Sequence, residues 1–255
     1  MKRWIRCFTA VEGFLSNRGQ SFLETALFLP ILLLFVAGTI EVGVYALKYM
    51  SVLDASREAA RFGSNLDPAL TAKYPLDMHG APFPDVRLMS TAELHSVCNN
   101  GESTNFYYEV ACLAIQNISS GTLKMEAGDD IVITVIGVKD GQLKHRWPTR
   151  DQGHPNDLDY HFQGANDGPA NASCTITNTE NCRSWSLYGN RTSTIDNAAI
   201  VNALHTSAPS TGFVIVEIYH AHPHFTSLFT IGEFIPNPIQ LRPFTIFPVP
   251  AAEPR

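Results

Sequence analysis

The chain has 255 residues, of which 45% are hydrophobic and 16% are charged, and this composition excludes an intrinsically disordered protein. Its 24 acidic and 18 basic residues give a formal net charge of −6. No cluster of Lys and Arg follows the spacing of a phosphate backbone, so the charge argues against a nucleic-acid-binding protein. The mean hydropathy of −0.02 excludes a polytopic membrane protein, although it averages over one strongly apolar segment.

That apolar segment follows a short basic one. Residues 1–19 contain four basic residues and one acidic residue. An uncharged run from Thr25 to Ile40 then covers roughly 24 Å as a helix, against about 30 Å for a bilayer core. The segment therefore spans a membrane only if Glu24 and Glu41 lie near its two edges or are paired. For Glu41 we expect an interfacial position at the outer edge.

Three interpretations of this N-terminus compete. A secretory signal peptide would end in a small-residue cleavage site, whereas here the apolar run continues into helix-compatible sequence. A plain signal anchor would leave the chain intact. Cleavage after Gly19 would instead make Gln20 the new N-terminus and Glu24 the fifth residue of the mature chain, one helical turn from a new ammonium group. The third interpretation gives the carboxylate a partner of opposite charge, without which its burial is costly.

The residues from Gly19 to Glu24, Gly-Gln-Ser-Phe-Leu-Glu, resemble a type IV prepilin cleavage site. Residues 18–62 resemble, more narrowly, the start of TadE-like proteins, which are minor pilin-like proteins of the tight-adherence (Tad/Flp) pilus. The resemblance rests on Arg18-Gly19-Gln20-Ser21, Glu24, Ala26-Leu27, Leu29-Pro30, Gly38-Thr39-Ile40-Glu41-Val42-Gly43 and Ala55-Ser56-Arg57-Glu58-Ala59-Ala60-Arg61. Thr25 departs from the aromatic residue usual in major Flp pilins, and together with the long remainder of the chain it favours a minor component.

The resemblance implies a role for each of three residues. Gly19 would be recognised by a prepilin peptidase, Gln20 would be the mature N-terminus, and Glu24 would pair with the amine of a neighbouring subunit during assembly. The further partners implied are other Tad/Flp pilin subunits, the inner-membrane pilus platform and membrane lipid. The implied location is the inner membrane, with the N-terminus inside and the head periplasmic or extracellular, or the pilus itself.

The domain organisation that we expect is a leader (1–19), a transmembrane helix (20–47), its extramembrane continuation (48–64) and a head (65–255). Within the head we expect a loop over 65–90, a helix over 105–118 and a long polar loop over about 142–191. Buried strands are predicted at 130–138 and 213–219, a weaker strand at 242–247, where Pro243 intervenes, and an extended Pro-rich tail in the last twenty residues. The predicted fold class is α+β, with a mainly antiparallel sheet packed against the N-terminal helix.

The cysteines favour an oxidising compartment. Cys7 lies in the leader, and the remaining even number outside the membrane suggests two disulfides. Four cysteines allow three pairings, of which sequence proximity favours Cys98–Cys112 and Cys174–Cys182. Metal binding is less favoured because no C-x-x-C spacing occurs.

Two clusters outside the apolar segment could bind a metal. The first is His220, His222 and His224, which Pro223 interrupts, and the second is an Asp-rich stretch, 151–167. We interpret them as packing or surface histidines and a solvated loop, and we predict no cofactor. No phosphate-binding loop, G-x-S-x-G or H-E-x-x-H motif occurs, which argues against an enzyme. Two alternatives stay open: an uncleaved, membrane-anchored binding or adhesive protein, and an anchored hydrolase using the histidines.

Overall fold

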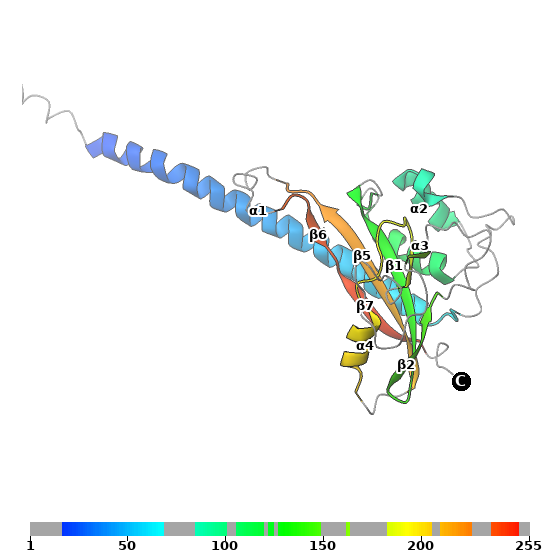
Figure 1. Cartoon of the computed structure of the whole chain (residues 1–255). Helices are drawn as coiled ribbons and strands as arrows, with labels where there is room; N and C mark the ends of the chain where they lie inside the picture. The colour runs from blue at the N-terminus through cyan, green and yellow to red at the C-terminus, as the bar shows by residue number, and fades with distance from the viewer. Residues whose placement is uncertain are drawn as a thin grey trace, which may run out of the picture. The chain divides into compact units, whose positions relative to one another are not determined.

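The computed structural model describes residues 17–68, 85–100, 106–119, 122–124, 127–148, 162–163, 183–205, 210–225 and 236–249. The helices are α1 (Asn17–Gly63), the short 3-10 helix η1 (Val86–Leu88), α2 (Thr91–Asn100), α3 (Phe106–Asn117) and α4 (Asn197–Ala203). The strands are β1 (Asp130–Lys139), β2 (Gln142–Trp147), β3 (Phe162–Gln163), β4 (Ser184–Ser186), β5 (Thr211–His222), β6 (Ile239–Leu241) and β7 (Phe244–Val249) (Figure 1).

The chain divides into two compact units, and each is described by itself. The helix unit consists of Met1–Ala46 together with His224–Asn237. The head unit consists of Leu47–Pro223 together with Pro238–Arg255. The first segment of α1 therefore belongs to the helix unit and its second segment to the head unit, although α1 is one uninterrupted helix that runs through Pro30.

An antiparallel sheet forms the centre of the head unit. Its two long strands, β1 and β5, pair from Asp130↔Tyr219 to Val138↔Thr211. On the outer side of β1 lie β2 and β4, and on the outer side of β5 lie β6 and β7. The predicted α+β class with an antiparallel sheet is confirmed.

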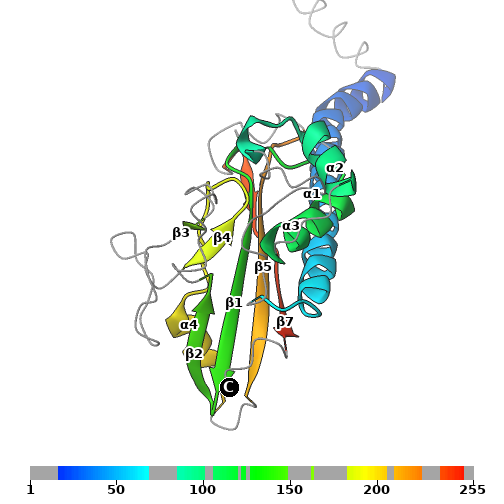
Figure 2. The same cartoon turned by 90° about the vertical axis from the view of Figure 1, so that its right-hand side faces the viewer.

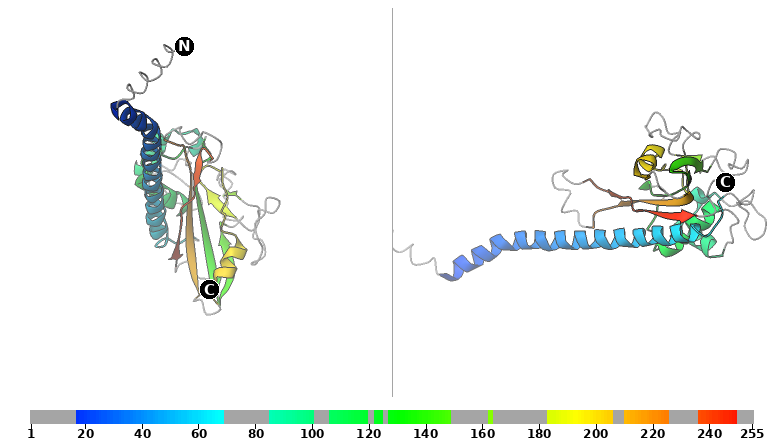
Figure 3. Two further views of the ribbon diagram at one scale, coloured as in Figure 1. Left: turned by 90° about the vertical axis from the view of Figure 1, so that its left-hand side faces the viewer. Right: turned by 90° about the horizontal axis from the view of Figure 1, so that it is seen from below.

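Both faces of the long strands are buried, because their alternate residues enter two different cores. Ile131, Ile133 and Val135 of β1 enter the larger core, which also contains residues of α1, α2 and α3. Ile136 and Val138 enter a smaller core under α4. Figures 2 and 3 show α3 and the second segment of α1 on one side of the strands and α4 on the other. Such two-sided burial explains why both strands are mainly apolar on both faces, with buried polar exceptions such as Thr134 and Glu217.

The second segment of α1 packs on the sheet through small side chains. Val52, Ala55, Ala59 and Ala60 are at most 1% exposed. The first three recur at the three- and four-residue spacing of one helical face, and Ala60 follows beside Ala59. Side chains of this size let the helix backbone approach the strands closely. At the end of the helix, a Cβ on Gly63 would lie 2.9 Å from Cγ2 of Val110, so this contact accepts only glycine without adjustment.

A buried carboxylate fixes the turn that follows β4. Oδ2 of Asp130 accepts hydrogen bonds from the Ser186 hydroxyl (2.6 Å) and from the backbone N–H groups of Asn190 (2.9 Å) and Arg191 (2.8 Å). Its Oδ1 accepts from the N–H of Tyr188 at 3.0 Å. Burial raises the pKa of Asp130 to about 6, although these donors act in the opposite direction by stabilising the ionised form.

Several predicted elements are confirmed and others are wrong. The helix predicted at 105–118 is α3, the strand predictions at 130–138 and 213–219 correspond to β1 and β5, and Pro243 separates β6 from β7. The loop predicted over 65–90 ends in η1, after which α2 begins at Thr91. The polar region 142–191 is not one loop, because it contains the strands β2, β3 and β4. In the C-terminal stretch, much of the predicted tail is β6 and β7, which pair with β5.

Candidate assembly and anchoring segment

The residues that the prepilin resemblance singled out lie at the beginning of α1. Gly19 and Gln20 are helical, and Glu24 follows four residues after Gln20. Residues four apart lie on the same face of a helix, about 6 Å apart along its axis. The Glu24 side chain is exposed. In this geometry the carboxylate is displayed on the helix surface one turn from the predicted new N-terminus.

The helix that follows presents a long apolar surface. Within the described residues, Phe22–Gly63 is the helix that is long and apolar enough to cross a membrane, with a mean hydropathy of 2.3 in its most apolar window, of which 6% is buried. Every side chain from Phe22 to Val36 is exposed, and these include Phe22, Leu27 and Phe35 at about 68–79% exposure. In water such a surface is unfavourable, so this segment requires lipid or the apolar face of another helix.

Glu41, at the end of this apolar run, is 7% exposed and belongs to a hydrogen-bonded group within the helix unit. Its Oε1 accepts a hydrogen bond from the backbone N–H of Phe225 at 2.8 Å and lies 3.3 Å from Nδ1 of His224. The other ring nitrogen of His224 is 3.0 Å from the carbonyl oxygen of Pro236. The expectation of an interfacial residue missed this pairing, because the partners lie more than 180 positions further along the chain.

The histidine cluster is divided between different surroundings. β5 ends at His222, so His224 does not continue the strand. His220 is buried, and its Nδ1 lies 3.0 Å from Oδ2 of Asp129, whose Oδ1 accepts from the N–H of Ala221. Among the described residues, no group of three or more His, Cys, Asp or Glu side chains is placed to hold a metal ion. The Asp-rich stretch 151–167 lies almost entirely outside the described residues, apart from the two residues of β3.

The head contains a disulfide between its two adjacent helices. Cys98 of α2 and Cys112 of α3 are joined, with Cα atoms 5.0 Å apart. The side-chain amide of Gln116 also donates to the Cys98 carbonyl oxygen at 2.7 Å. This is the pairing that sequence proximity favoured. The predicted partners Cys174 and Cys182 lie outside the described residues.

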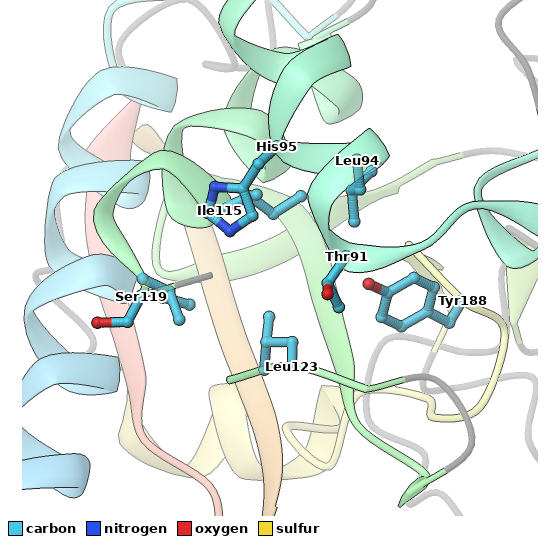
Figure 4. Close-up of a pocket in the computed structure, with 8 residues that line it drawn as sticks. Thr91, Leu94, His95, Ile115, Ser119, Leu123 and Tyr188 are labelled. Atoms are coloured by element: carbon cyan, nitrogen blue, oxygen red, sulfur yellow. The ribbon is translucent and has the colours of Figure 1, made fainter. Parts of the chain in front are cut away.

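Two hollows in the head offer little chemistry. The first is a space of about 10 Å³, room for a single water molecule, between α2, α3, Leu123 and Tyr188 (Figure 4). The second is a groove of about 350 Å³ between α4 and the sheet, and all of its lining residues are apolar, including Ile200, Phe213 and Ile246. A ligand site usually adds a few polar groups that fix orientation, and this groove supplies none.

Comparison with known families concerns the N-terminal helix. Residues 19–61 match the family model described as TadE-like protein. This segment is similar to TadE-like proteins. The match confirms the resemblance that the sequence indicated, begins at the glycine of the expected cleavage site and ends within the last turn of α1. It covers less than a fifth of the chain, and no curated protein or solved structure matches.

The limits of the TadE-like segment follow the structure closely. It contains the exposed apolar surface, Glu24, Glu41 and the small buried residues that pack on the sheet. The head beyond α1 lies outside the match, including the disulfide and both hollows. The matched residues of this chain therefore form a helix with one apolar, exposed segment and one segment that packs on the sheet.

Proposed function

We propose that this chain is a minor pilin of the Tad/Flp pilus system, cleaved between Gly19 and Gln20 and then incorporated into the pilus or used to prime its assembly for adherence or secretion. The proposal makes the chain a structural component rather than an enzyme. The observation that carries it is the TadE-like segment, in which Glu24 lies four residues after Gln20 on an apolar and exposed helix. Before assembly this helix anchors the chain in the inner membrane, with its basic N-terminus inside.

Glu24 gives the assembled helix its register. A carboxylate among apolar helices is costly unless it meets an opposite charge, and the amine of a cleaved neighbour supplies one. Subunits that bring this pair together are favoured over those displaced along the helix axis. The exposed side chains of Phe22, Leu27 and Phe35 then pack against neighbouring pilin helices instead of lipid.

The proposal is tested by co-expressing the chain with the prepilin peptidase and sequencing the N-terminus of the membrane-bound product. We expect the mature chain to begin at Gln20. Gly19→Val should block cleavage, because a branched side chain replaces the glycine before the scissile bond. Gly43→Val is the matched control, since a Cβ at Gly43 meets nothing within 4 Å, and it should be processed normally.

The competing function is an uncleaved, membrane-anchored binding or adhesive protein. It is favoured if Met1 is still present on the chain in cells that contain an active peptidase. Equal processing of the Gly19→Val and Gly43→Val variants would contradict the proposed cleavage site.

A further inference from the structure

The first described residues of the connection between β5 and β6 contact α1 at Glu41. Glu41 accepts the hydrogen bond of the Phe225 backbone N–H at 2.8 Å and lies 3.3 Å from Nδ1 of His224. The His224 backbone N–H donates in turn to Oδ1 of Asn237 at 3.2 Å, and its ring contacts the carbonyl of Pro236. Both ends of the connection, at residues 224–225 and 236–237, are thus held beside Glu41, and all of these residues belong to the helix unit.

The hydrogen-bonding atoms in this group satisfy one another. Both ring nitrogens of His224 face acceptor oxygens, one from Glu41 and one from Pro236. An N–H on either ring nitrogen therefore has an acceptor oxygen within 3.3 Å. The His224 side chain is 2% exposed and that of Glu41 is 9% exposed, so water does little to solvate either group. Pairing makes the presence of Glu41 at the end of an apolar helix tolerable.

The depth of this group in the membrane follows from the helix rise. Glu41 lies 17 residues after Glu24, which corresponds to about 26 Å along the helix. A bilayer core of about 30 Å then has Glu24 near its inner edge and Glu41 near its outer edge. Phe225, which Glu41 binds through the backbone, is 70% exposed. An exposed aromatic ring at this depth has the headgroup and acyl boundary of the outer leaflet as its apolar surroundings.

The sequence of the connection agrees with this placement. Between Phe225 and Pro236 it carries five large apolar residues and one charged residue, Glu233. The apolar residues are Leu228, Phe229, Ile231, Phe234 and Ile235. A connection facing water is normally polar, so this apolar composition is unusual for a surface connection.

We propose that Glu41 anchors the β5–β6 connection to α1 at the outer surface of the membrane and that Phe225 inserts into the phospholipid headgroup region. The chain thereby gains a second lipid contact next to its membrane helix. The inference rests on the membrane-spanning part of the proposed function and is independent of cleavage and pilus assembly.

The test uses the full chain with Phe225→Trp, reconstituted in phosphatidylcholine vesicles, and the difference in fluorescence from the unmodified chain. We expect emission at short wavelength, strong quenching by lipid brominated near the headgroup and weak quenching by aqueous iodide. Leu88→Trp is the comparison variant, because Leu88 is also a large apolar residue, 85% exposed, in the head unit. Its indole should be quenched by iodide and not by the brominated lipid.

A second pair of variants tests the anchor. Glu41→Leu, combined with Phe225→Trp, removes the acceptor and should increase iodide quenching. Glu41→Gln keeps an acceptor oxygen for the Phe225 N–H and should preserve the protection. Iodide quenching of the indole at position 225 as strong as that at position 88 would overturn the lipid contact. Protection from iodide without quenching by brominated lipid would indicate a protein contact instead, and it would overturn the proposal too.

These outcomes are separate from those of the proposed function. A chain that is not cleaved, or that never enters a filament, still gives the expected quenching if Glu41 and Phe225 act as inferred. Conversely, a normally processed chain without lipid quenching leaves the pilin proposal intact and refutes the contact of Phe225 with lipid.

Discussion

Removing the disulfide tests how the head stabilises its short helices. Cys98 and Cys112 close a loop of about 15 residues between α2 and α3. A crosslink of that length stabilises a fold by about 3 kcal/mol, because it restricts the unfolded chain. We expect Cys98→Ala and Cys112→Ala each to lower the free energy of unfolding by about this amount. Cys98 is 4% exposed, so the lost packing of its sulfur adds a smaller contribution.

The double variant is the decisive measurement. The crosslink is lost only once, so the double variant should be scarcely less stable than either single variant. The assay is denaturant unfolding of the purified full chain in detergent micelles, followed by the fluorescence of Trp185, which is buried in the head core. Cys7→Ala, in the expected leader, is the control and should leave the unfolding midpoint unchanged. Losses that add in the double variant would refute the reasoning, because they would show two independent contributions rather than one shared bond.

Three further predictions concern the helix and the buried carboxylate. Gly63→Ala should destabilise the head by about 1 kcal/mol in the same unfolding assay, because crowding against Val110 outweighs the gain in helix propensity. Gly43→Ala is the control, and it should cause no loss because a Cβ there meets open space. Glu24→Gln should leave cleavage intact but reduce the amount of this subunit in the sheared pilus fraction. Glu58→Gln, which removes an exposed pair with Arg61, should leave that amount unchanged. Equal incorporation of both variants would contradict the pairing role. Because the pKa of Asp130 is raised to about 6, its contribution to stability is complete below about pH 4 and is lost as the pH rises through 6, on the order of 3 kcal/mol in total. The unfolding free energy of the unmodified chain minus that of Asp130→Asn should therefore fall between pH 4 and 7, and a flat difference would contradict the shift.

Much of the fold could be predicted from periodicity, and the part that could not depends on contacts remote in sequence. β1 and β5 carry apolar residues on both faces, so the sequence alone indicates two buried strands. β2 has exposed or partly exposed residues at four of its six positions, and its strand structure comes from pairing with β1. A polar stretch of this kind gives no periodic signal before its partner is known.

Two of the missed helices did carry a local signal. Ser90 and Glu93 form a capping box at the start of α2, in which the Ser90 N–H donates to Glu93 and the Glu93 N–H donates to the Ser90 hydroxyl. Asp196 caps α4 by accepting from the N–H of Ala199. Both helices are short, so these caps would have been stronger evidence than their hydrophobic pattern.

The candidate site divides in the same way. The positions of Gly19, Gln20 and Glu24 follow from spacing along one helix, which sequence expresses directly. The contacts of Glu41 do not, because a backbone N–H and an imidazole from the β5–β6 connection reach it across more than 180 positions. An acidic residue at the end of an apolar run indicates that a partner exists, but only the fold identifies the partner.

The two segments of α1 differ in side-chain size, because they face different surroundings. In the exposed segment, large residues such as Leu27 and Phe35 give the greatest apolar area to lipid or to another helix. In the segment against the sheet, Ala55, Ala59 and Ala60 keep the backbone close to β5 and β7, and Ser56 donates to or accepts from the Thr245 hydroxyl at 2.9 Å. For a sheet to pack against alanines, these small residues must recur at the spacing of one helical face. The side chains of the sheet itself are less restricted.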